Sequence, residues 1–127
     1  MDAGPIYLKK PLWLHGSAEE IFLRAADVIA DMIVELLAKD PEPQSQQGEP
    51  TIFKRRTPED GDLAAALSLN EAFDLMRMLD AQGYPNAFLN IGPFRIEFFR
   101  ASRKANLVEA DVRIRLADSA GDGKEER

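Results

Sequence analysis

Asp2 and His15 are the side chains near the start of the chain that could take part in acid–base chemistry. Asp2 lies just before Gly4 and the pair Ile6-Tyr7. Glycine permits a sharp turn and Ile-Tyr favours an extended backbone, so this order is typical of a carboxylate held where a loop enters a strand. The same residues also fit an ordinary N-terminal segment, and the spacing alone favours that second interpretation. We expect His15 to be a surface residue beside a helix start.

Composition excludes several classes of site. The chain has 127 residues, of which 45% are hydrophobic and 30% charged, as expected for one small domain or a compact unit with appendages. It contains no cysteine and one histidine, which excludes thiolate chemistry, disulfides and His-rich metal sites, so we expect no metal. The net charge of -6 makes nucleic acid an unlikely general partner. No segment looks like a membrane span or a signal peptide, which predicts a cytoplasmic protein.

The first half of the chain predicts one strand and one long helix. Residues 5–14 have a strand pattern that Pro11 interrupts. Ser17 and Glu20 have capping-box spacing, and apolar residues then recur every three to four positions, which predicts a helix over residues 18–39. Its apolar stripe contains Ile21, Phe22, Ala25, Ala26, Val28, Ile29, Met32, Ile33, Leu36 and Leu37. A stripe of this length requires a sheet of several strands, whereas only one short strand precedes the helix.

The middle of the chain is predicted to be a linker. Residues 40–50 are rich in Pro and Gln, and a spacer is favoured over a polyproline ligand. A short strand is expected over residues 51–53, and a turn with Asp60-Gly61 at its tip over residues 57–62. Between them, the basic run 54–56 suits either a phosphate-binding patch or a solvated loop, and the acids that follow it favour the loop.

The second half predicts a helix followed by a meander. The helix should begin after Ser68 and end at Gly83. Three strands should follow, over residues 87–91, 94–101 and 107–116. In the last strand we expect alternate residues to point into the core, namely Val108, Ala110, Val112, Ile114 and Leu116. Phe88 and Phe99 suit either internal packing, which we favour, or an exposed contact surface.

These elements predict an α+β protein in four parts. The first part, residues 1–40, has a strand and a long amphipathic helix, and residues 41–63 form a linker and loop. Residues 64–116 form a small α+β domain with one helix and a three-stranded antiparallel meander. The polar segment 117–127 is expected to be a disordered tail.

Three segments resemble formyltransferases that use 10-formyltetrahydrofolate, a family that includes methionyl-tRNA formyltransferase and the sugar N-formyltransferases. They are Phe53-Lys54-Arg55-Arg56-Thr57-Pro58-Glu59-Asp60-Gly61-Asp62-Leu63, Met76-Arg77-Met78-Leu79-Asp80 and Tyr84-Pro85-Asn86-Ala87-Phe88. In the family, a basic segment followed by Thr/Ser-Pro and acids leaves the catalytic domain, and a helix bearing Arg leads into a Tyr/Trp-Pro-Gly-Ala turn. Asn86 stands here where the family usually has Gly, and we expect a left-handed turn that Asn tolerates.

The resemblance extends to the first residues and implies a role for Asp2. The segment Asp2-Ala3-Gly4-Pro5-Ile6 matches the family's Asp-x-Gly-x-Ile segment. Asp2 would then be the carboxylate of the family's catalytic Asn, His and Asp set. The Asn and His precede this segment in the family, on a Rossmann-like sheet that also forms much of the folate pocket, and His15 does not match the catalytic position. The resemblance therefore implies the C-terminal half of a formyltransferase, truncated before most of its 10-formyltetrahydrofolate pocket and inactive alone.

Two questions stay open at the level of sequence. Because the chain is acidic, we expect a small amine such as a nucleotide-linked amino sugar as acceptor, in preference to methionyl-tRNA. The chain could instead be a non-catalytic assembly module that docks on a separate N-terminal half or homodimerises through the stripe of helix 18–39. A split protein, a misplaced start and a remnant of an interrupted reading frame are equally compatible with the sequence.

Overall fold

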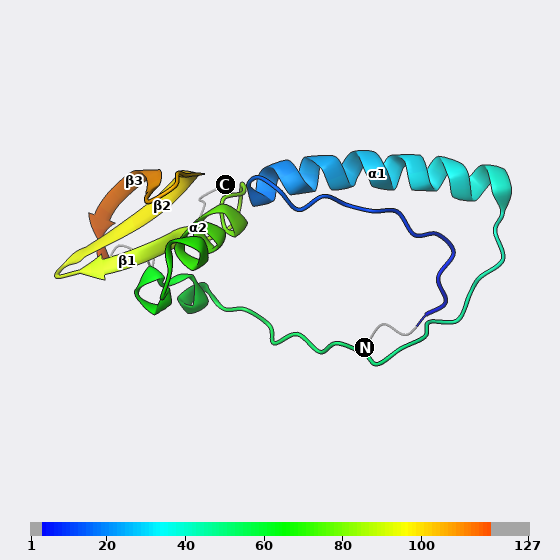
Figure 1. Cartoon of the computed structure of the whole chain (residues 1–127), viewed down its shortest axis with the longest axis horizontal. Coiled ribbons are helices and arrows are strands. Elements are labelled where there is room, and N and C mark those ends of the chain that lie inside the picture. The colour runs from blue at the N-terminus through cyan, green and yellow to red at the C-terminus, as the bar shows by residue number, and fades with distance from the viewer. Residues whose placement is uncertain (1–3, 118–127) are drawn as a thin grey trace, which may run out of the picture. The chain divides into compact units, whose positions relative to one another are not determined.

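The computed structural model describes residues 4–117, and it has the predicted mixture of helices and antiparallel sheet. Its elements are α1 (Ala18–Lys39), the 3₁₀ helices η1 (Pro58–Gly61) and η2 (Leu63–Ala65), α2 (Leu69–Met78), β1 (Ala87–Ile91), β2 (Phe94–Arg103) and β3 (Val108–Leu116) (Figure 1). The α+β fold class is therefore confirmed. Among the described residues, contacts define an N-terminal unit, residues 4–16 and 20–55, and a C-terminal unit, residues 17–19 and 56–117.

The helix α1 has the predicted bounds, but the predicted strand before it does not form. In residues 5–14 only Ile6 pairs, with Gln44, through hydrogen bonds of 2.7 and 2.9 Å between their backbone N and O atoms. Two prolines remove backbone donors from this segment, and no described strand lies beside it to complete a ladder. The strand expected over residues 51–53 is also wrong, since Ile52 and Phe53 are 78% and 85% exposed and unpaired in a sheet.

The apolar stripe of α1 remains largely uncovered. Ile29, Ile33 and Leu37 are 55%, 52% and 81% exposed. A helix in a globular protein normally buries such a stripe against a sheet or another helix. The high exposure of Ile29, Ile33 and Leu37 agrees with the expectation that this stripe requires a larger sheet than the segment before the helix provides.

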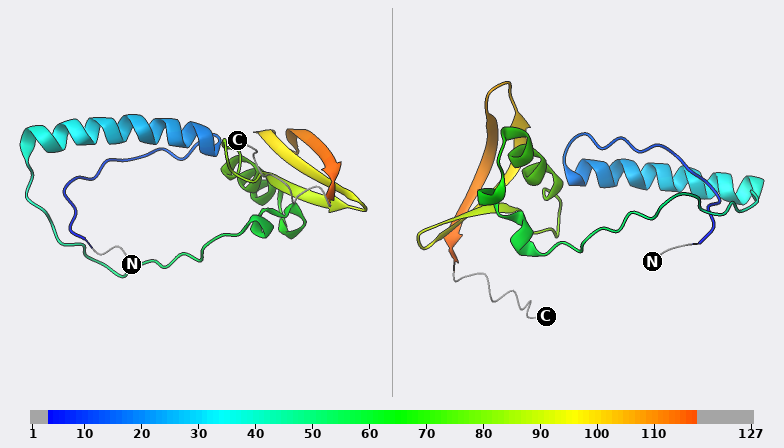
Figure 2. Two further views of the ribbon diagram at one scale, coloured as in Figure 1. Left: turned by 180° about the vertical axis from the view of Figure 1, so that it is seen from behind. Right: turned by 60° about the horizontal axis from the view of Figure 1, so that its bottom comes forward.

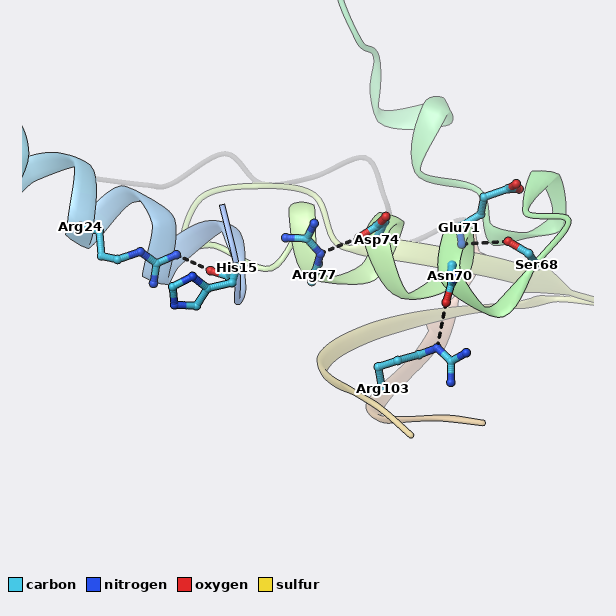
Figure 3. A network of polar contacts seen from close by, with 8 residues as sticks. All are labelled: His15, Arg24, Ser68, Asn70, Glu71, Asp74, Arg77 and Arg103. Carbon is cyan, nitrogen blue, oxygen red and sulfur yellow. Dashed lines mark hydrogen bonds and ion pairs between the residues drawn. The ribbon is translucent and has the colours of Figure 1, made fainter. Parts of the chain in front are cut away.

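Two polar contacts hold the extended segment 5–15 against α1. The Arg24 guanidinium donates hydrogen bonds to the Trp13 carbonyl at 3.1 and 3.3 Å and to the His15 carbonyl (Figure 3). Glu35 accepts from Lys10 at 2.5 Å and from Lys39 at 2.9 Å. The pKa of Glu35 is lowered to about 2, first by the hydrogen bond from Lys10 and then by the one from Lys39.

The C-terminal unit is built on a sheet in the order β1-β2-β3, with both pairs antiparallel. Gly92, at a φ of +56°, turns the chain between β1 and β2. Figure 2 shows α2 lying against one face of this sheet. The core consists of Leu63, Met76 and Ala87, with Ala72, Leu75, Leu79, Leu89, Phe98, Ala101, Val108 and Ala110 packed around them.

α2 begins where the sequence predicts and ends earlier. Ser68 caps its start, because the Ser68 hydroxyl accepts from the Glu71 backbone N at 3.1 Å (Figure 3). The helix ends at Met78, not at Gly83. Gly83 has the left-handed conformation expected of it, with a φ of +80°, but it lies in the turn that leads to β1.

A β-bulge interrupts the pairing of β2 and β3 between Phe99 and Ser102. Arg100 has a φ of +51° in this bulge, and its backbone N donates to the Asp80 carboxylate at 2.7 Å. The Asp80 carbonyl also accepts from the backbone N of Glu19 at 3.2 Å. Asp80 therefore stabilises an uncommon backbone conformation in the sheet and binds the backbone of Glu19, which belongs to the same unit.

The predicted burial of the last strand is correct only for its first half. Val108 and Ala110 pack against the core, whereas Val112, Ile114 and Leu116 are 50%, 61% and 58% exposed. The alternation itself is correct, because these five residues share one face of the sheet. The short α2 and the 3₁₀ helices cover only the part of this face next to the core.

Candidate functional site

Asp2, the predicted catalytic carboxylate, lies outside the described residues, but the segment that follows it is described. The Gly4 carbonyl accepts from the Gln46 side chain at 2.8 Å, and Ile6 pairs with Gln44. The predicted spacer therefore holds the backbone two residues beyond Asp2. The linker sequence offers no signal that would predict this contact, because it depends on the chain reversing after α1.

A groove of about 460 Å³ lies between this segment and α1. Residues 4–8 form one wall and Ile29, Met32 and Ile33 part of the other, so its lining is mainly apolar. The Gln46 amide nitrogen, the polar group at its rim, already donates to Gly4. A pterin ring requires several hydrogen-bonding partners and a glutamate tail requires cations, so the described residues do not form a pocket that fits 10-formyltetrahydrofolate.

His15 is exposed, as expected for a surface residue beside a helix start. Its backbone carbonyl accepts from Arg24 (Figure 3). Among the described residues, no group of three or more His, Asp or Glu side chains could hold a metal ion. No helix in the described range is long and apolar enough to span a membrane.

The three segments that carry the family resemblance converge in the C-terminal unit. Asp62 forms a parallel bridge with Phe88. Gly61 is buried, and neighbouring atoms lie close to its Cα. A Cβ atom at this position would lie 3.1 Å from Leu79 Cδ1 and 3.6 Å from both the Asn86 backbone O and the Phe88 ring. The three segments thus meet at one packed junction around Gly61, which explains why a glycine suits the tip of the loop.

The loop that contributes Gly61 is fixed by its own capping box. The Asp60 carboxylate accepts from the Thr57 backbone N at 2.7 Å, and the Arg56 guanidinium donates to the Asp60 carbonyl at 2.9 Å. Of the basic run 54–56, only its last residue, Arg56, is therefore part of this structured turn. Lys54 and Arg55 are exposed and take part in no ion pair within the described chain, in agreement with the solvated-loop interpretation.

Asn86 does not have the left-handed conformation expected for it. Arg100 and Asp40 are the non-glycine residues of the described chain with a positive φ. Gly83 provides the left-handed residue three positions earlier, so the turn before β1 places no such requirement on residue 86. The exchange of the family's Gly for Asn is therefore accommodated without backbone strain.

The face of the sheet opposite the core contains a cluster of arginines around one buried acid. The members of this arginine face are Phe88, Asn90, Arg95, Glu97, Phe99, Asp111, Arg113 and Arg115. Glu97 is 8% exposed and forms ion pairs with Arg95 at 3.6 Å, with Arg113 at 3.8 Å and with Arg115. The register places Glu97 opposite Arg113 as an opposite-charge pair, and it places Arg95 opposite Arg115, two like charges whose repulsion the shared partner Glu97 offsets.

The two aromatic residues of this face are covered by guanidinium groups. The Arg95 guanidinium lies 3.5 Å from the centre of the Phe88 ring. Arg100 and Arg113 lie 5.1 and 5.4 Å from that of Phe99. Phe88 is 4% exposed, in agreement with packing, whereas Phe99 is only partly buried beside exposed arginines, so packing of Phe99 on the helix or linker stays a prediction. The Nε atoms of Arg95 and Arg115 are buried without a hydrogen-bond partner.

Comparisons with known proteins agree on one family. A family model described as "Methionyl-tRNA formyltransferase, C-terminal domain" matches residues 58–115. Among solved structures, the chain is similar to methionyl-tRNA formyltransferase from Clostridium thermocellum, with 49% sequence identity and a TM-score of 0.86. The alignment covers 91% of this chain and 51% of that one, so the chain spans about half the length of the structure it matches.

Proposed function

Because the chain belongs to the formyltransferase family and contains its C-terminal part, we propose that it is the C-terminal portion of an enzyme that formylates methionyl-tRNA. The donor in this proposal is 10-formyltetrahydrofolate. The observation that carries the proposal is the 49% identity over 91% of the chain to a methionyl-tRNA formyltransferase. The family assignment also agrees with the packed junction of the three motif segments around Gly61.

The acceptor proposed here differs from the one that the sequence alone favours. The preference for an amino sugar depends on the net charge, and it is not supported, because the descriptions of the matched family model and of the matched structure both name methionyl-tRNA formyltransferase. The acidic residues are also unevenly distributed. Residues 4–53 contain eight Asp and Glu against four Lys and Arg, whereas residues 87–116 contain three against six. The sheet therefore carries the positive charge that a polyanionic acceptor requires.

Formyl transfer to an amine requires removal of a proton from the attacking nitrogen and stabilisation of an oxyanion. We assign Asp2 to the first task as the carboxylate that orients a histidine. His15 is exposed and bound through its backbone to Arg24, so it does not fit that role. The described residues provide no donor pocket, and we therefore expect the chain alone to be inactive. A cytoplasmic location stays a prediction.

Complementation in trans tests this proposal. The chain is mixed with the half of the Clostridium thermocellum protein that it does not match, and release of tetrahydrofolate from 10-formyltetrahydrofolate is followed with methionyl-tRNA or a nucleotide-linked amino sugar. We expect no turnover by the chain alone, and turnover with methionyl-tRNA after mixing. Asp2→Asn should lower that turnover about 100-fold or more, because acid–base catalysis contributes effects of this size.

Asp27→Asn is the matched control, because Asp27 is an exposed acid on α1, and it should leave turnover unchanged. Turnover by the chain alone would contradict the fragment proposal. Preferential use of the amino sugar would overturn the proposed acceptor and leave the family assignment intact.

A non-catalytic assembly role is the second candidate, and the exposed stripe of α1 favours it. In this role Ile29, Ile33 and Leu37 pack against a separate N-terminal half. Light scattering on the mixture distinguishes the two candidates. A stable complex that Ile33→Lys weakens, but that shows no turnover with either acceptor, supports the assembly role alone.

A further inference from the structure

The end of the sheet farthest from the core carries a group of exposed apolar side chains. We name it the sheet patch, and its members are Ile91, Phe94, Val112, Ile114 and Leu116, which are 57%, 46%, 50%, 61% and 58% exposed. The pairing of Ile91 with Phe94 and of Phe94 with Leu116 places three of them in one row across the strands. Ile114 lies opposite Ile96 and Val112 opposite Phe98, so the patch continues on the same face.

The covering elements of the C-terminal unit do not reach this patch. The side chains packed around Leu63, Met76 and Ala87 belong to the other end of the same face, and none of the five patch residues is among them. The outer edge of β3 also has no partner strand in the described chain. A twisted three-stranded sheet with one half-covered apolar face is a common site of association between subunits.

We propose that the sheet patch is the interface of a two-fold homodimer of this chain. The two faces of the sheet differ in the partner that they accept. The arginine face holds Arg95, Arg113 and Arg115 against the acids Glu97 and Asp111, so it keeps a net positive charge and two copies of it would repel each other. The patch face has no charged residue at its five positions, and an identical surface satisfies it without leaving a charge unpaired.

The area of the patch is compatible with a weak, concentration-dependent dimer. With about 200 Å² for a fully exposed large apolar residue, the five half-exposed residues offer roughly 500 Å² per copy. Two copies would bury roughly 1,000 Å², which is at the lower limit for specific interfaces. We therefore expect a dimer that dissociates on dilution, so that monomer and dimer can both be observed.

Sedimentation velocity of the full chain over a concentration series tests the proposal. The variant Ile114→Lys should weaken dimerisation at least tenfold, because it places a charge in the centre of an apolar contact. Ile33→Lys on α1 is the matched control, since it makes the same exchange at a side chain that is 52% exposed, and it should leave the equilibrium unchanged. Circular dichroism confirms that both variants are folded.

Three results overturn the proposal. A chain that is monomeric at all concentrations shows that the patch has another occupant. Loss of the dimer in Ile33→Lys but not in Ile114→Lys assigns the interface to α1. Equal loss of the dimer in both variants contradicts an interface made by the sheet patch alone.

The experiment is independent of the proposed enzymatic role. It requires neither an N-terminal half nor a substrate, so absence of formyl transfer leaves its result unaffected. Conversely, a monomeric chain would leave complementation with the N-terminal half as a separate question.

Discussion

At the scale of single residues, Glu97 is the most constrained ionisable side chain of the C-terminal unit. It is 8% exposed and stands among Arg95, Arg113 and Arg115 on the face opposite the core. A buried carboxylate among three guanidinium groups compensates their mutual repulsion, while the Phe88 ring supports Arg95 from the other side. The arrangement explains how a face with three arginines can form part of a stable sheet.

The exchange Glu97→Gln should therefore destabilise the protein by about 1–3 kcal/mol, because it leaves the partly buried guanidinium groups of Arg95 and Arg115 without their counter-charge. Urea denaturation followed by circular dichroism measures this change. Glu109→Gln is the control, since Glu109 and Lys104 are 65% and 52% exposed in a 3.5 Å ion pair, and its effect should stay within about 0.5 kcal/mol. Equal effects of the two exchanges would contradict a special role of Glu97.

At the scale of elements, the N-terminal unit depends on polar contacts more than on a core. The segment 5–15 has one β-bridge, to Gln44, and is otherwise held to α1 by Arg24 and by the pair of Lys10 with Glu35. Most of the apolar stripe of α1 stays exposed beside it. Protonation of Glu35 should thus weaken the attachment of segment 5–15 to α1, whereas it should not change the packing of α2 on the sheet.

Acid should release the segment only at low pH. The pKa of Glu35 is lowered from 4.5 to about 2 by hydrogen bonds from Lys10 and Lys39. A group with a lowered pKa contributes its full stabilisation above its ordinary pKa, and this contribution is lost as the pH falls from about 4.5 towards 2. The Ile6 amide resonance should therefore shift with a midpoint near pH 2, and Glu35→Gln should abolish the transition. A midpoint near pH 4.5 in the wild type would show that the pair does not form.

At the scale of the whole molecule, the two units differ in how they are stabilised. The C-terminal unit has a core around Leu63, Met76 and Ala87, and its strands are continuously paired apart from one bulge. In the N-terminal unit, Ile21 is the large apolar side chain that is buried among those described. Residues 45–56 have neither helix nor strand and end in the exposed pair Lys54 and Arg55.

Limited proteolysis with trypsin should therefore cut first at Lys54 or Arg55 and leave a resistant fragment that contains α2 and the sheet. Cleavage of an exposed, unpaired backbone requires little unfolding, whereas cleavage at Arg100 or Arg113 requires opening of the ladder. Mass spectrometry of early time points identifies the order of cleavage. Early cleavage at Arg113 would show that the sheet is not the stable part of the chain.

The sequence by itself determined the features that arise within a few neighbouring residues. The bounds of α1, the cap at Ser68 and the hairpin at Gly92 follow from local propensity and spacing, and all three agree with the structure. The motif segments around Gly61 and Phe88 likewise resemble the family that the comparisons with known proteins match. Asp2 remains a prediction from the same motif, because it lies outside the described residues.

Only the tertiary structure decided which surfaces these elements cover. Residues 5–14 have a strand pattern but no neighbouring strand, so one bridge to Gln44 forms where a ladder was predicted. Ile114 alternates correctly and is still exposed, because α2 is too short to cover its end of the sheet. Alternation determines on which face of the sheet a side chain lies. Its burial depends on partners distant in the sequence, and no local pattern predicts how much of the sheet those partners cover.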